Sequence, residues 1–86
     1  MRIKPEHYNQ IKTAIASIDR NKIKTHAEAV KESGKFKDFG MRMRWDCLHS
    51  TGIFKDDFMQ SVYSYAHDEH IDTALRNIVA ELNIEF

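Results

Sequence analysis

The sequence contains few of the residues that cross-links, turns and membrane spans require. Its 86 residues include one cysteine, one proline and three glycines. The single cysteine, Cys47, excludes an intrachain disulfide, and we expect a reduced thiol that packs as a small apolar side chain. Runs of apolar residues other than glycine are at most three long, too short for a membrane span or a secretion signal. We therefore expect a cytoplasmic protein with no membrane association.

Net charge is also absent, but only because two opposite halves cancel. Residues 1–44 hold 11 Lys and Arg against 5 Asp and Glu, a net charge of +6. Residues 45–86 hold 2 against 8, a net charge of −6. Such a split is typical of an interaction surface, but it also arises when a basic half packs against an acidic half of the same chain. Both explanations stay open at this point.

The pattern of apolar residues predicts helices. They recur at spacings of three and four residues, and no segment alternates convincingly between apolar and polar residues. The chain length permits one domain, and no repeat or linker divides it. The sequence therefore predicts an all-α, single-domain compact bundle of about five short helices over residues 1–86.

Start and stop signals place these helices along the chain. Pro5 suits the first helical position, because its missing N–H is not needed there. Polar caps are expected at Asn21 or a Thr25–Glu28 capping box for the second helix, at Asp56 or Asp57 for the fourth, and at Asp68 for the fifth. The third helix is expected to begin at about Asp38. The expected stops include Gly34, Gly52 and Asn83.

The third helix, expected from about Asp38 to Ser50, has apolar residues on two sides. One stripe contains Trp45, which we expect in the core, and a second contains Cys47. A helix that is apolar on two sides is usually central to its bundle. We further expect a polar network to fix how the third and fifth helices meet. Its candidate members are Arg42, Arg44, Asp46 and Asp72.

No arrangement of residues predicts catalysis. Serine, cysteine and histidine are present without a nucleophile–base spacing or a glycine-rich loop. The polar cluster at residues 67–72 is explained by helix capping and by an i,i+4 pair of Asp72 with Arg76. A metal site that includes His67 and His70 is the weaker alternative. We therefore predict a protein that is not an enzyme, with no catalytic residue, metal ligand or cofactor.

Two stretches resemble a known group of proteins. Residues 44–48 read Arg-Trp-Asp-Cys-Leu, and residues 63–76 read Tyr-Ser-Tyr-Ala-His-Asp-Glu-His-Ile-Asp-Thr-Ala-Leu-Arg. They resemble small, mostly uncharacterised proteins encoded by phages, prophages and plasmids of Gram-negative bacteria. The pattern of that family is an Arg-Trp-Asp-Leu-Leu helix, a Leu-Tyr-x-Tyr-Leu-Asn segment and an Asp-Asp-His-Ile-Asp-Thr-Ala-Leu-Arg helix. The opening Ile-Lys-Pro-Glu-His-Tyr is also similar, so the resemblance covers most of the chain.

This chain departs from the family pattern at three places. Cys47 replaces a leucine, which argues against a required thiol. Ala66 and His67 replace Leu-Asn, which argues against His67 as a required ligand, and Glu69 is a small change from aspartate. The family implies no activity for this chain. What the resemblance implies is an origin on a mobile element and a cytoplasmic location.

The first function hypothesis is a small non-enzymatic interaction protein of phage or plasmid origin. It would bind a host or element-encoded protein, in a role such as interference with a host system, and self-association as a homodimer is compatible with it. Aromatic residues are frequent at interaction hot spots. The candidate interaction surface consists of Tyr63, Tyr65 and Phe86.

The second hypothesis is a nucleic-acid-binding accessory protein that uses the basic N-terminal half. Its candidate contacts are Lys35, Lys37, Arg42 and Arg44. A helix-turn-helix with Gly34 in the turn fits poorly, because its reading helix would be apolar on two sides. The chain as a whole also lacks the basic excess that is usual for such proteins.

Overall fold

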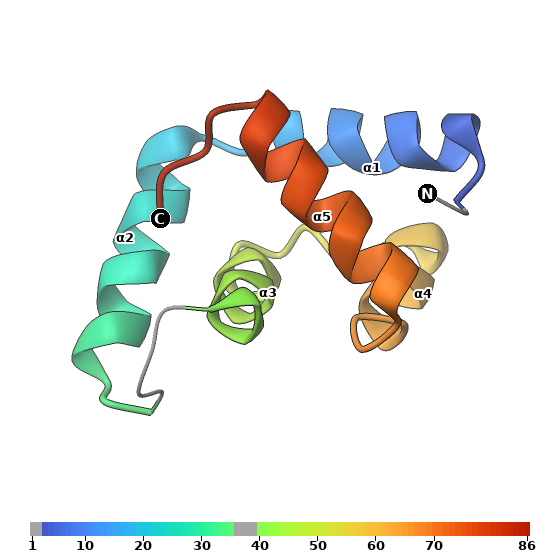
Figure 1. The fold of residues 1–86 in the computed structure, drawn as a ribbon. Coiled ribbons are helices and arrows are strands. Elements are labelled where there is room, and N and C mark those ends of the chain that lie inside the picture. Colours follow the sequence, from blue (N-terminus) through green and yellow to red (C-terminus); the bar gives the residue numbers. More distant parts are fainter. Residues whose placement is uncertain (1–2, 36–39) are drawn as a thin grey trace.

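The chain folds into five helices, here described from a computed structural model for residues 3–35 and 40–86. The helices are α1 (Pro5–Ala16), α2 (Arg20–Glu32), α3 (Met41–Ser50), α4 (Asp57–Ser64) and α5 (Glu69–Glu81). None of the described residues lies in a strand. The prediction of a single compact all-α bundle of five short helices is therefore confirmed. Figure 1 shows α3 in the middle, with α2 on one side and α5 crossing on the other.

Three predicted helix starts are confirmed, and two of them have a side-chain cap. Pro5 is the first residue of α1. The Asp56 carboxylate accepts a hydrogen bond from the Met59 amide at 2.7 Å, and α4 follows it directly. The Asp68 carboxylate accepts from the second and third amides of α5. Each cap satisfies amides that the first turn of a helix cannot pair internally.

Helix α2 begins earlier than either predicted start. The Asp19 carboxylate accepts a hydrogen bond from the Asn21 amide at 2.7 Å, so Asp19 takes the capping role and Asn21 lies inside the first turn. The Thr25 hydroxyl donates to the Asn21 carbonyl at 2.8 Å, within the helix, and so does not cap it. Both alternatives for this start were therefore wrong.

Helix α3 begins later than predicted. Gly40 has an extended backbone (φ −108°, ψ −165°) and is the N-terminal cap, so the first helical residue is Met41. The predicted start at Asp38 is wrong, and Asp38 itself lies outside the described residues. The predicted stops hold: Gly34 (φ 68°), Gly52 (φ 82°) and Asn83 (φ 52°) adopt the left-handed conformation, which only glycine and asparagine adopt readily.

The core is built around α3, as predicted. Four of its ten residues are buried, on two sides of the helix: Met43, Trp45, Cys47 and Leu48. Trp45 is only 6% exposed, so its predicted place in the core is confirmed. Helix α1 contributes Ile11 and Ile15, and α5 contributes Leu75 and Ile78. Among the described residues, no polar or charged residue is buried.

The basic and acidic halves of the chain are joined between α1 and α5. Lys12 Nζ lies 3.1 Å from Glu81 Oε2, and the Tyr8 hydroxyl donates to the same oxygen at 2.9 Å. These hydrogen bonds hold the pKa of the Glu81 carboxyl below its ordinary value. Burial, followed by the bond to Glu81, raises the pKa of Tyr8.

Basic side chains of α2 bind the segment after α5 through its main-chain oxygens. An Arg20 guanidinium N–H donates to the Leu82 carbonyl at 3.3 Å, and Lys31 Nζ donates to the main-chain oxygen of Phe86 at 2.9 Å. Part of the charge split is therefore internal, since basic side chains of α1 and α2 contact the last helix and the residues after it. Within the described ranges, no helix has the length and apolar character that crossing a bilayer demands.

The contact at Glu81 predicts a small contribution to the free energy of unfolding that is lost in acid. A carboxyl with a lowered pKa in the folded state stabilises the fold above its unfolded pKa, and this contribution is lost as the pH falls through the folded pKa. Glu81→Gln should therefore unfold more readily than wild type at neutral pH, and the two should converge below about pH 4. Urea unfolding across this pH range measures the difference. Glu85→Gln, an exposed control, should follow wild type, and parallel curves for Glu81→Gln would contradict the assignment.

Because the Cys47 thiol is buried, we expect it to react slowly with disulfide reagents while the protein is folded. Its side chain is fully buried, and burial, with a contribution from Asp46, raises its pKa. Only the thiolate reacts quickly with disulfide reagents. The native protein should therefore react with Ellman's reagent no faster than the rate at which unfolding exposes Cys47. A Cys47→Ala, Ser50→Cys variant should react at once, because position 50 is exposed on the same helix. Rapid labelling of native wild type would disprove this.

Candidate interaction groove

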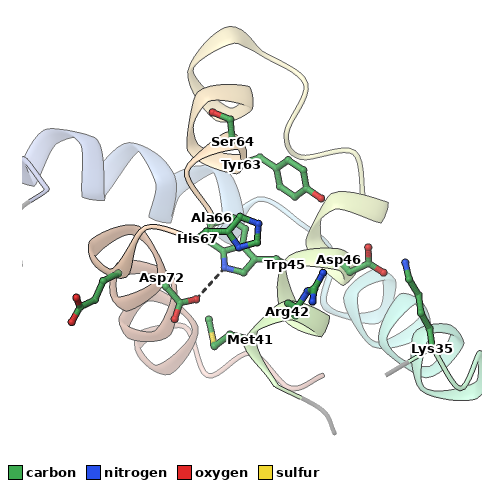
Figure 2. A pocket seen from close by; sticks show the side chains of 11 residues that line it. Lys35, Met41, Arg42, Trp45, Asp46, Tyr63, Ser64, Ala66, His67 and Asp72 are labelled. Carbon is green, nitrogen blue, oxygen red and sulfur yellow. Dashed lines mark hydrogen bonds between the residues drawn. The ribbon is translucent and has the colours of Figure 1, made fainter. Parts of the chain in front are cut away.

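A hollow of about 820 Å³ opens between α3, the end of α4 and the start of α5 (Figure 2). We call it the Trp45 groove, after the residue at its centre. Helix α3 forms one wall and α5 faces it, while residues 63–67 close one end. Its charged lining residues are Lys35, Arg42, Asp46, Glu69 and Asp72.

One hydrogen bond joins the two walls of the groove. The Trp45 indole Nε1–H donates to Asp72 Oδ1 at 3.2 Å, drawn as the dashed line in Figure 2. Asp72 Oδ2 accepts from Arg76 Nε at 3.2 Å, which confirms the predicted i,i+4 pair. The ring of Trp45 is also packed against Phe54, with centroids 5.6 Å apart, and edge-on against Tyr63 at 6.3 Å. The indole is thus held by ring contacts and by its N–H.

The predicted polar network between the third and fifth helices has different members. Asp72 receives its hydrogen bonds from Trp45 and Arg76, not from Arg42 or Arg44. The Arg44 guanidinium lies 5.7 Å from the centre of the Phe86 ring, and Arg42 is exposed in the groove. Trp45, the neighbour of Arg44 in sequence, is the residue of α3 that donates to Asp72. The predicted arginine link was therefore wrong.

The aromatic residues predicted as an interaction surface do not all line the Trp45 groove. Tyr65 is 62% exposed and borders a smaller hollow of about 290 Å³ beside Ile71. Tyr63 is half-buried and lines the Trp45 groove, where its ring centroid lies 4.6 Å from that of His49. Phe86 is half-buried beside Arg44. Of the three, only Tyr63 belongs to the groove.

The residues predicted to contact nucleic acid are also separated. Lys35 and Arg42 both line the Trp45 groove, where three carboxylates accompany them. Arg44 is half-buried and outside the groove, and Lys37 lies outside the described residues. The described members of this set therefore form no continuous positive face within the groove.

The two histidines of the cluster at residues 67–72 lie on different hollows. His67 lines the Trp45 groove, whereas His70 borders the smaller hollow near Tyr65. Among the residues with described positions, no three His, Cys, Asp or Glu side chains converge as metal ligands do.

Sequence reasoning missed Glu69 as a groove residue. It treated Glu69 only as a charge in the first turn of α5, where the residue indeed lies. Its position across the groove from Arg42 depends on how α3 and α5 cross. No local spacing records that crossing, so the sequence held no signal for this pair.

The bond between Trp45 and Asp72 predicts a clear difference between two substitutions. Asp72→Ala leaves the indole N–H without its acceptor and should lower the free energy of unfolding by about 1–3 kcal/mol. Asp72→Asn keeps an oxygen in place and should cost less. Arg76→Ala removes only an exposed pair, worth about 1 kcal/mol or less. Urea unfolding followed by Trp45 fluorescence ranks the variants, and equal losses for Asp72→Ala and Asp72→Asn would contradict the role of the bond.

Comparisons with known protein families, curated proteins and solved structures find no match to this chain. A functional assignment therefore has to come from the chemistry of the groove itself. That chemistry combines aromatic and apolar side chains at the centre with charges of both signs around them.

Proposed function

We propose that this chain is a small non-enzymatic interaction protein that binds another protein through the Trp45 groove. The composition of the groove carries the proposal. Met41 and Tyr63 are half-buried and supply apolar and aromatic surface, together with the small exposed part of Trp45. Arg42 lines the groove with them. Tryptophan, tyrosine, methionine and arginine are the residue types enriched at protein–protein interfaces, and charged residues are typical of the polar rim.

The charges of the groove support a protein partner over a nucleic acid. Among the described residues, two cations and three carboxylates line it, and the carboxylates would repel a phosphate backbone. A segment of another protein can present both signs of charge, and a nucleic acid cannot. Nucleic-acid binding stays the alternative, with weaker support from Lys35 and Arg42 alone.

The biological setting of the proposal comes from the family resemblance. Proteins carried by phages, prophages and plasmids act inside a bacterial host, so we propose a cytoplasmic partner that is encoded by the host or by the element. Interference with a host system is one such role. Self-association as a homodimer is the variant in which the partner is a second copy.

Pull-down experiments with matched variants test this function. Wild type, Arg42→Glu and Lys24→Glu are immobilised and incubated with nuclease-treated cytosol of a Gram-negative bacterium. Lys24 is exposed on α2 and does not line the groove, so its reversal changes net charge equally. A protein retained by wild type and Lys24→Glu but lost from Arg42→Glu is the expected result. Equal retention by all three, or recovery of a nucleic acid alone from untreated cytosol, would overturn the proposal.

A further inference from the structure

The two walls of the Trp45 groove carry opposite charge. Lys35, the third residue after α2, belongs to the α3 side of the groove together with Arg42 and Asp46. The formal charges of these described residues sum to +1. Glu69 and Asp72 belong to the α5 side, and their charges sum to −2. Figure 2 shows Asp72 on one side of Trp45 and Arg42, Asp46 and Lys35 on the other. The groove is therefore electrically bipolar across its width.

One charge on each wall is available to a partner. Arg42 and Glu69 are both exposed. In the part of the chain that the structure describes, neither side chain forms a hydrogen bond or an ion pair. Asp72, in contrast, already accepts from Trp45 and Arg76. Arg42 and Glu69 are therefore the groove residues that most strongly select where a partner carries its acidic and basic residues.

The shape of the groove determines what kind of body fits it. A hollow of about 820 Å³ needs a convex occupant, such as a helix or an extended segment with a projecting side chain. Two such hollows placed face to face would enclose a void, and voids forfeit dispersion contacts. A second copy that uses the same groove is therefore a poor occupant. The centre, lined by Met41, Trp45, Tyr63 and Ala66, suits an apolar side chain.

We infer that the occupant is a segment of another protein with an apolar residue between an acidic residue and a basic residue. The acidic residue faces Arg42 and the basic residue faces Glu69. Exposed ion pairs contribute little affinity, so the apolar residue supplies the binding while the two charges select the partner and its orientation. The inference rests on the proposed function and deepens it, because it names the chemistry of the partner.

Selection from a displayed library of random peptides tests the inference. The baits are wild type, Arg42→Glu with Glu69→Lys, and Lys24→Glu with Glu28→Lys. The first double variant exchanges these two exposed charges of the groove and keeps the net charge. The second makes the same exchange on α2, outside the groove. Wild type and the α2 control should enrich peptides with an acidic, an apolar and a basic position in one order. The groove variant should enrich the opposite order.

Binding of one selected peptide gives the quantitative measurement. Titration is followed by fluorescence of Trp45, which is the one tryptophan of the chain. Arg42→Glu and Glu69→Lys should each weaken binding about tenfold or more, because each places like charges together, and Lys24→Glu should leave it unchanged. Only variants whose circular dichroism shows the same helix content as wild type are compared.

Three results would overturn the inference: no enriched peptide, enriched peptides of one charge sign, or the same order from the reversed groove. These outcomes are separate from a failure of the proposed function. A cytosolic partner that is retained equally by the Arg42→Glu variant counts against the function, whatever peptides the groove selects. Peptide order that ignores the groove charges counts against the inference, even if a cytosolic partner depends on Arg42.

Discussion

The packing of Trp45 is the constraint on which the rest of the structure depends. Its ring lies against Phe54 and Tyr63 in the core, so its N–H is removed from water and requires an acceptor. Asp72 supplies that acceptor from the first turn of α5. Since α3 supplies buried residues on two sides, fixing α5 against it fixes the centre of the bundle. The Trp45 groove lies between these two helices and the end of α4.

The opposite charges of the two halves serve two purposes in the folded protein. Some are used internally, where Lys12 and Tyr8 hold Glu81 and where α2 binds the segment after α5. Others stay exposed on the two walls of the groove, where the described structure has no hydrogen bond or ion pair for Arg42 or Glu69. The internal explanation that the sequence left open therefore applies to part of the charge split. The exposed remainder includes the groove that we propose as a binding surface.

What the sequence could predict is what local chemistry decides. Asp56 and Asp68 cap helices because a carboxylate reaches amides two or three residues ahead, a distance within one turn. At α2, Asp19 and Asn21 are both good caps two residues apart, so composition could not choose between them. The arginine link failed for another reason: successive residues of a helix point in different directions. Whether Arg44 or Trp45 bonds to Asp72 depends on the rotation of α3, which only the assembled core sets.

The same helix forms the core and a wall of the groove, and this limits how the protein can work. Any substitution of Trp45 alters the core and the groove together, so folding and recognition cannot be varied separately there. Arg42 and Glu69 differ, because both are exposed and neither supports the core. A ligand that binds only the folded state also stabilises it by mass action. For the proposed function, this means that specificity can change at the two exposed charges while the aromatic centre, which the fold itself requires, stays constant.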